Sequence, residues 1–272
     1  MSFKKPAEIA EQLIGTGIKK TALPFGKVFV LAIIAGVFIA LGAELSTIVS
    51  YDLGGFSFGF ARFMAGSVFS LGLVLVVVAG AELFTGNCLV IIPYLEKKVS
   101  IKQLLKCWGI VYIGNFIGSL LFVFLIFYSG IYGFNNSAIA TYAVEIAARK
   151  VNLDFTQAFL RGIGANFLVV LAVWLAVASD DVIGKIAGIY FPIMAFVASG
   201  FEHSIANMYF IPIGILLKDF VSTTVSLDNL SVIGFLLNNL LPVTIGNVIG
   251  GAVFVGAVYW YAYVYKTKKI KR

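Results

Sequence analysis

The chain has 272 residues, of which 60% are hydrophobic and only 12% are charged, and its mean hydropathy is +1.00. Because an ordinary soluble domain carries about a quarter charged residues, this composition excludes a water-soluble globule and predicts an integral membrane protein with several spans. The net charge of +7 sits at the chain ends and in short connections, which argues against a nucleic-acid partner. The cysteines, Cys88 and Cys107, form no CxxC motif, so we expect no disulfide framework, no metal and no cofactor.

Residues 1 to 27 combine apolar side chains at near-helical spacing with acidic and basic ones, which predicts a short cytoplasmic amphipathic helix on the membrane surface. Six apolar regions follow, near residues 28–50, 63–95, 107–129, 158–178, 186–217 and 233–265. Each is long enough for a transmembrane helix, which needs about 20 apolar residues. The connection from 130 to 157 holds a helix-like segment, TYAVEIAARK, placed to cap the outer mouth. A basic cytoplasmic tail, 266–272, ends the chain.

The second and fifth apolar regions are too long for simple spans. They have 33 and 32 residues, and a straight helix of that length measures about 48 Å, against a hydrocarbon core of about 30 Å. Each also carries an acidic residue, an asparagine and a proline toward its middle or end. We therefore expect two broken helices, whose irregular backbone is buried in protein or lines a cavity, because lipid cannot pair its amides.

An internal repeat relates the two halves of the chain. GAELFTGN at 80–87 matches GFEHSIAN at 200–207, and IGNFIG at 113–118 matches IGNVIG at 245–250, each pair in corresponding places. If each half holds three spans, an odd number, the second half enters the membrane inverted relative to the first. The prediction is one membrane channel domain, with a first repeat over 28–129, an inverted second repeat over 158–265, and a site near the midplane.

The basic residues predict the orientation. Most of the 20 lysine and arginine residues fall in the two termini and in the connections after the second and fourth spans. Since positive residues favour the cytoplasmic side, we expect both termini to be cytoplasmic.

His203 is the only histidine, and it lies in the break of the fifth region. An ionisable residue at membrane depth is a functional candidate, and histidine changes charge near neutral pH. The repeat places Thr85 opposite Ile205, so the two breaks bring a hydroxyl and an imidazole to comparable depths. Both groups can donate hydrogen bonds to a small anion.

The two breaks also share an acidic residue and an asparagine. Glu82 and Glu202 occupy the same repeat position, and we expect their carboxylates to accept hydrogen bonds from amides that the breaks expose. Asn87 and Asn207 are expected to cap the half-helices that follow, because asparagine is among the best N-cap residues. The N-termini of those half-helices would favour an anion over a cation at the centre.

The segments AGAELFTGN, GIGANFLVVLAVW and FVASGFEHSIANMYFIP resemble the formate/nitrite transporter family. The resemblance covers nearly the whole chain and departs at Val170, where the family commonly has cysteine, and at Gly86, where some members have serine. It implies an aquaporin-like protomer of six spans, assembled as a homopentamer in a prokaryotic inner membrane, with one pore in each protomer.

Carried over by motif, the resemblance also assigns pore residues. Thr85 and His203 form the central polar pair. Lys150 is an outer lysine with Asn166 as its pore-side neighbour. The apolar constriction is formed by Phe69, Leu73, Leu83 and Phe196.

We therefore expect a channel or transporter for a small monovalent anion, with formate first and nitrite or hydrosulfide as alternatives. Either His203 passes a proton to the anion or the anion crosses on hydrogen bonds alone, and the sequence leaves both open. A neutral-solute channel of the aquaporin type is expected to have the motif Asn-Pro-Ala at both breaks, and this chain has that motif at neither. An enzyme is not expected, because the adjacent residues His203 and Ser204 would not face each other on a helix.

Overall fold

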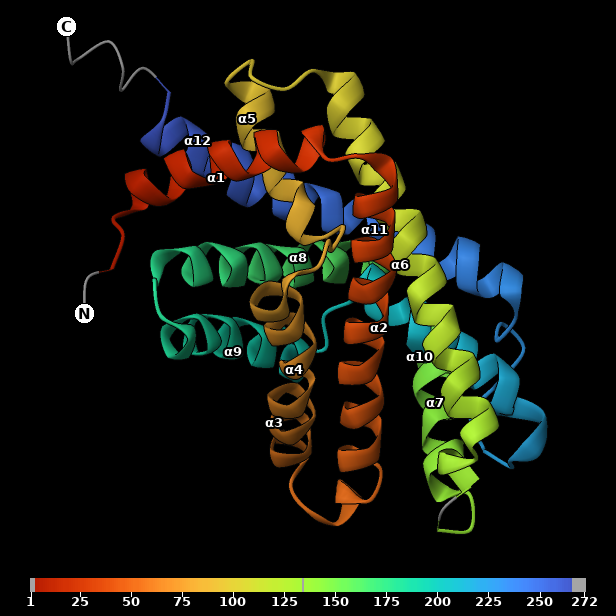
Figure 1. Cartoon of the computed structure of the whole chain (residues 1–272). Helices are drawn as coiled ribbons and strands as arrows, with labels where there is room; N and C mark the ends of the chain where they lie inside the picture. Colours follow the sequence, from red (N-terminus) through yellow and green to blue (C-terminus); the bar gives the residue numbers. More distant parts are fainter. Residues whose placement is uncertain (1–2, 134, 266–272) are drawn as a thin grey trace, which may run out of the picture.

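The computed structural model describes residues 3–133 and 135–265, which contain helices and connections but no strand (Figure 1). Six helices in this part are long and apolar enough to cross a membrane. They are Phe25–Ser50, Phe58–Gly80, Ile101–Ser129, Phe155–Ala178, Val182–Ser199 and Gly234–Tyr263. The predicted all-α architecture with six spans is confirmed. The expected basic tail, 266–272, lies outside the described residues.

The N-terminal half, in its described residues, runs through seven α-helices and, besides η1 (Leu53–Gly55), three short 3-10 or π-helical segments. These are α1 (Pro6–Ala22), α2 (Phe25–Ser50), α3 (Phe58–Phe69), α4 (Leu71–Val74), η2 (Leu75–Gly80), η3 (Gly86–Val90), α5 (Ile91–Leu95), α6 (Ile101–Ser129) and, after η4 (Ile131–Gly133), α7 (Ala138–Val151). The C-terminal half begins at α8. It contains α8 (Phe155–Ala178), α9 (Val182–Ser199), α10 (Ser204–Leu217), η6 (Gly234–Leu240), α11 (Leu241–Val248), η7 (Ile249–Ala257) and α12 (Val258–Tyr263).

Helix α1 covers the segment predicted to be an amphipathic helix, and it packs on the protein; its place on the membrane surface stays a prediction. Its apolar residues Ile9 and Leu13 are buried in a cluster with Leu89 and Ile92 of the η3–α5 segment. Figure 1 shows α1 lying across one end of the bundle, beside α5 and α12, with α7 near the other end. The apolar face of α1 is thus removed from water by an apolar surface of the protein.

The two overlong apolar regions are each divided between two helices. The helix that includes η2 stops at Gly80, whose φ of +89° lies in the region that glycine adopts readily, and helical structure resumes at Gly86. In the second half, α9 stops at Ser199, Gly200 has a φ of +81°, and α10 begins at Ser204. A left-handed glycine after the last turn ends both helices. The inverted orientation of the second repeat stays a prediction.

Close helix packing through glycine holds the breaks in place. A Cβ atom added to Gly118 of α6 would lie 1.9 Å from the Ile33 carbonyl oxygen of α2. In the second half, a Cβ atom on Gly250 would lie 2.2 Å from the Ile163 carbonyl oxygen of α8. Small residues let the backbones approach where lipid provides no hydrophobic drive for packing. The closely packed pairs α2–α6 and α8–η7 thereby lie next to the two breaks.

Candidate functional site

The two breaks meet at one polar contact. The Oγ1 atom of Thr85, which precedes η3, lies 2.9 Å from Nε2 of His203, which precedes α10. Both side chains are buried. The sequence placed these residues at comparable depths, and the structure brings them into direct contact.

The other ring nitrogen of His203 fixes the direction of this hydrogen bond. Nδ1 accepts the Ala206 backbone N–H at 3.1 Å, so His203 is the N-cap of α10. A nitrogen that accepts a hydrogen bond carries no proton, so the neutral imidazole has its proton on Nε2. His203 therefore donates to Thr85, and the Thr85 hydroxyl keeps its own proton for another acceptor.

Two cavities approach this pair from opposite ends of the bundle. The cavity on the side of α7, of about 770 Å³, is lined by His203 and Lys150 among others, and we call it the α7-side cavity. The cavity on the side of α1, of about 380 Å³, is lined by Lys20 and Glu82 among others, and we call it the α1-side cavity. Thr85 is fully buried and lines neither of them. The pair therefore lies where a route between the cavities would pass.

Buried apolar side chains line both cavities. Phe69 and Phe196 line the α7-side cavity, with ring centroids 5.5 Å apart in an edge-to-face arrangement, and the Phe196 ring lies 5.8 Å from the His203 ring. Leu73 and Leu83 line the α1-side cavity. All four side chains are buried. The four residues assigned to the constriction thus divide into two pairs, one lining each cavity.

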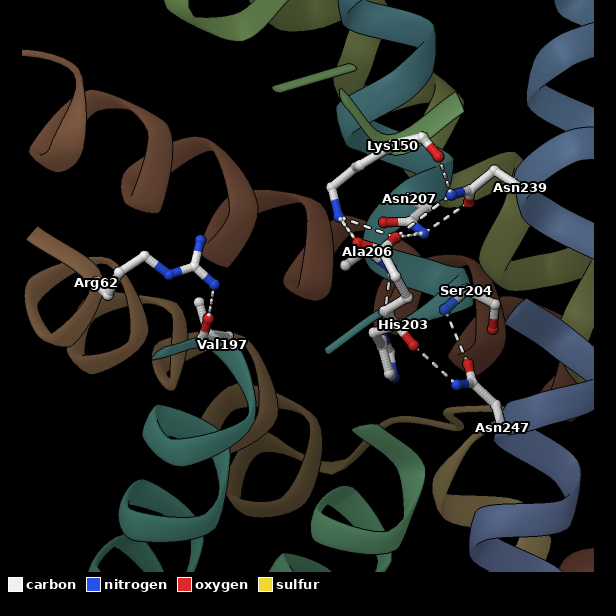
Figure 2. Close-up of polar contacts among 10 residues, drawn as sticks. Arg62, Lys150, Val197, His203, Ser204, Ala206, Asn207, Asn239 and Asn247 are labelled. Carbon is white, nitrogen blue, oxygen red and sulfur yellow. Dashed lines mark hydrogen bonds and ion pairs between the residues drawn. The ribbon is translucent and has the colours of Figure 1, made fainter. Parts of the chain in front are cut away.

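Each break has a buried carboxylate paired with a lysine. Lys20 Nζ of α1 lies 2.8 Å from Oε2 of Glu82, and Lys150 Nζ of α7 lies 2.9 Å from Oε1 of Glu202. Asn87 and Asn207 donate to the same two carboxylates at 2.8 Å and 2.7 Å. Figure 2 shows the group around Lys150, Asn207 and Asn239.

These contacts correct two expectations. The side chains of Glu82 and Glu202 accept hydrogen bonds from lysine and asparagine side chains, not from amides that the breaks expose. Asn87 and Asn207 lie inside the half-helices and are not their N-caps, a position that His203 takes in α10. A buried carboxylate needs a cation as well as hydrogen bonds, and the lysines supply it.

Asn115 and Asn247 pair the backbone groups that the breaks free. The Asn115 side chain donates to the carbonyl oxygens of Ala32 and Glu82, at 2.7 Å and 2.9 Å, and accepts the Phe84 N–H at 2.9 Å. The Asn247 side chain makes the corresponding bonds with the carbonyl oxygens of Gly162 and Glu202 and with the Ser204 N–H (Figure 2). The sequence pointed to both residues through the IGNFIG and IGNVIG pair, but only as markers of the repeat.

Comparison with known proteins places this arrangement in one family. The family model for formate/nitrite transporters matches residues 7–261. The chain belongs to the formate/nitrite transporter family. It is 43% identical to a probable formate transporter of Methanothermobacter thermautotrophicus, over 97% of this chain and 98% of that one. It is 41% identical to the formate channel FocA of Escherichia coli K12, over 95% and 94% of the two chains.

The fold agrees with solved structures of the family. A structure described as a pentameric formate channel with formate bound superposes with a TM-score of 0.80 at 36% identity, covering 88% of this chain and 98% of that one. A second, described as an ion channel of the formate/nitrite transporter family, superposes with a TM-score of 0.81 at 28% identity, covering 93% and 98%. The chain is therefore a membrane transport protein.

In this family member, Asn166 lies away from the mouth where the resemblance placed it. Its Nδ2 donates to the carbonyl oxygens of Asn247 and Thr85, at 2.7 Å and 3.3 Å, and to Cys88 Sγ at 3.3 Å. It is fully buried and is not among the residues that line the α7-side cavity, whereas Lys150 is. Asn166 thus positions the backbone of the Thr85 break. It is a support of the polar pair and not a neighbour of Lys150.

Lys20 and Asn239 belong to the site and were not predicted as members of it. Lys20 was assigned only to an amphipathic helix, and nothing in its local sequence marks a lysine that reaches a buried carboxylate 62 residues away. Asn239 accepts from Asn207 at 2.7 Å and donates to the Lys150 carbonyl oxygen at 2.9 Å. A polar residue in an apolar span was the available signal for Asn239.

The described residues show neither a metal site nor a histidine–serine pair arranged for nucleophilic catalysis. Within 3–133 and 135–265, no group of three or more His, Cys, Asp or Glu side chains is arranged to hold a metal ion. The ring nitrogens of His203 contact Thr85 and Ala206, while the Ser204 hydroxyl has no hydrogen-bond partner. A histidine that does not contact the serine cannot serve as its base.

Proposed function

We propose that the chain conducts a small monovalent anion, formate first, between the α7-side and α1-side cavities. The observation that carries the proposal is the Thr85–His203 contact at the junction of the two routes. Because His203 donates to Thr85, the Thr85 hydroxyl is free to donate to an anion that has passed an apolar pair. The names of the relatives support formate in particular, since they describe formate channels and transporters.

The two apolar pairs supply the selectivity. A bare anion loses several kcal/mol of hydration when it leaves water, and only hydrogen bonds or a proton can offset that cost. Phe69 and Phe196 line the larger cavity beside His203, and Leu73 and Leu83 line the smaller cavity. An ion must shed water at each apolar pair, so we infer that large or strongly hydrated ions are rejected and that a small, weakly basic anion passes.

The proposal includes transfer of a proton from His203 to the anion, which requires that both ring nitrogens of His203 first carry a proton. Neutral His203 holds one ring proton, and giving it up would leave an imidazolate, so only a doubly protonated ring can pass a proton through Thr85 to formate. Protonation of Nδ1 would break its bond from the Ala206 amide. Proton transfer therefore requires the start of α10 to rearrange, whereas hydrogen bonding alone does not.

We further infer that the protein assembles as a homopentamer, with the α1 end of the bundle in the cytoplasm of a prokaryotic cell. The solved relative described as pentameric supports the assembly, and the excess of lysine at both termini supports the orientation. The mass of the purified complex in detergent tests the first inference. Labelling of a single cysteine placed in each terminus of a cysteine-free variant, in intact cells, tests the second.

The test of the function is flux in proteoliposomes. Formate, nitrite, hydrosulfide, chloride and glycerol are compared at pH 5 and pH 7, by anion-driven swelling or current. Formate flux above empty liposomes and above chloride supports the proposal, and a larger flux at pH 5 supports proton participation. Hydrosulfide or nitrite flux without formate flux would change the substrate, and glycerol flux without anion flux would overturn the proposal.

A further inference from the structure

The connection between α5 and α6 carries three exposed lysines. Lys97, Lys98 and Lys102 lie within six residues of one another, and Figure 1 shows this connection at the α1 end of the bundle. In the described part of the chain, none of the three side chains has a hydrogen-bond or ion-pair partner. Glu96, the acidic residue nearest to them in the sequence, accepts a hydrogen bond from Trp260 Nε1 at 2.8 Å. The three ammonium groups are therefore available to a ligand from outside the chain.

The other connection expected in the cytoplasm, between α8 and α9, binds its lysines within the protein. Lys185 Nζ donates to the carbonyl oxygens of Ala176 and Ser179, at 3.1 Å and 2.6 Å, and Lys4 Nζ pairs with Asp180. Lysines in cytoplasmic connections follow from the orientation of a membrane protein, and that rule applies equally to both connections. It does not explain why the lysines of one connection are held by the protein and those of the other are free.

The free lysines project from a hydrogen-bonded backbone. The N–H of Lys98 donates to the Pro93 carbonyl oxygen at 2.9 Å, and the Ser100 side chain accepts the Gln103 N–H at 3.3 Å as the N-cap of α6. Lys97 has a φ of +58°, a left-handed conformation that glycine adopts more readily than lysine. The turn would therefore form more easily without this side chain, so the turn itself does not account for a lysine at position 97.

The start of α6 lies where the membrane meets water. The helix has 29 residues, which corresponds to about 43 Å against a hydrocarbon core of about 30 Å, so its first turns extend into the headgroup layer. Ile101 and Leu105 are 46% and 56% exposed in these turns. Ile113, about three turns after Lys102 and so on the same side of the helix, is 56% exposed. The lysines thus lie beside exposed aliphatic side chains that continue into the span.

We propose that Lys97, Lys98 and Lys102 bind the phosphate of an anionic phospholipid, whose acyl chains lie along Leu105 and Ile113. Charge complementarity gives the ligand class, because lysines near a membrane surface attract anionic headgroups and their contributions add. The exposed aliphatic side chains favour a lipid over a soluble phosphate, since only a lipid brings an apolar chain to cover them. The inference does not depend on which anion the protein conducts.

The test compares phosphatidylglycerol with phosphatidylcholine of identical acyl chains. Each lipid is titrated onto the full-length protein in detergent, and native mass spectrometry measures the fraction of protein that retains it. We expect the wild type to bind phosphatidylglycerol more tightly than phosphatidylcholine. The double variant Lys98→Gln with Lys102→Gln should weaken phosphatidylglycerol binding about 25-fold, or about fivefold for each lysine. Its binding of phosphatidylcholine should not change, and Lys102→Arg, which keeps the charge, should bind phosphatidylglycerol as the wild type does.

The matched control is Lys5→Gln with Lys19→Gln, which removes two exposed lysines from α1. Equal weakening in the two double variants would mean a general positive field and would overturn the site. So would an unchanged affinity in the Lys98→Gln with Lys102→Gln variant, or equal binding of the two lipids by the wild type. Displacement of the lipid by an equal concentration of glycerol 3-phosphate would assign the lysines to a soluble phosphate and overturn the lipid. If the double variant is not monodisperse, the two single variants decide the question by the fivefold loss expected of each.

Discussion

The side chains of Asn115 and Asn247, which lie 132 positions apart in the chain, make equivalent sets of hydrogen bonds. Each lies in the span that follows a break, donates to two carbonyl oxygens and accepts one backbone N–H, with bond lengths from 2.7 to 3.0 Å. A broken helix in a membrane exposes backbone groups that lipid cannot pair. One asparagine side chain pairs two such groups in each break and also donates to a carbonyl oxygen of a neighbouring helix, α2 or α8.

Replacement of Asn247 by leucine is expected to destabilise the fold. The change leaves the Glu202 carbonyl and the Ser204 N–H without this partner, each at a cost of about 1–3 kcal/mol, and should lower the unfolding midpoint in detergent by about 10 °C. Fluorescence-detected size exclusion after heating measures it. Asn238→Leu is the control, because Asn238 is an exposed asparagine in the same span. Equal midpoints in the two variants would contradict the assigned role.

Removal of the Lys150 side chain should leave the buried Glu202 carboxylate without a cation. Lys150→Met leaves Glu202 charged and without its cation, and losing one partner of a buried pair costs about 3–5 kcal/mol. We expect a clear loss of thermal stability, and recovery of most of it in Lys150→Met with Glu202→Gln, which removes the stranded charge. Lys106→Met, which alters an exposed lysine, is the control. Failure of the double variant to recover any stability would show that the pair is not the cause.

His203 has two roles that two substitutions separate. Asparagine retains an N-cap for α10, whereas phenylalanine loses it at a cost of about 1 kcal/mol. Phenylalanine has no donor for Thr85, and the shorter asparagine amide has no donor at the position of the His203 Nε2 atom, so we expect formate flux to fall about tenfold or more in both variants. Both should also lose any dependence of flux on pH between 5 and 7. Stopped-flow flux measurements check this, and an intact pH dependence in a folded variant would remove His203 from the proton route.

Gly118→Val tests the contact between α2 and α6. An added Cβ would meet the Ile33 carbonyl oxygen at 1.9 Å, so the two helices must separate. We expect little folded protein, measured as the monodisperse fraction in detergent. Gly109 lies in the same helix with nothing within 4 Å of an added Cβ. Gly109→Val should therefore behave like the wild type, and similar yields for the two variants would argue against tight packing at Gly118.

The sequence by itself determined the class of protein, the six spans and the places of the two breaks. These follow from local quantities: the length of an apolar run against the bilayer thickness, and glycine, proline and charge inside a run that is too long. The family motifs also identified Thr85 and His203. Hydropathy along a chain is sufficient for such conclusions, because each span meets the same lipid solvent.

Only the tertiary structure decided which groups pair in the breaks. The contacts Lys20–Glu82, Asn115–Ala32 and Thr85–His203 join residues 62, 83 and 118 positions apart. Sequence reasoning gave the carboxylates backbone partners and gave Asn87 and Asn207 capping roles, because it considered only neighbours along the chain. A buried polar group is paired by whichever partner the packing of distant helices brings within reach, and hydropathy and periodicity contain no information about that partner.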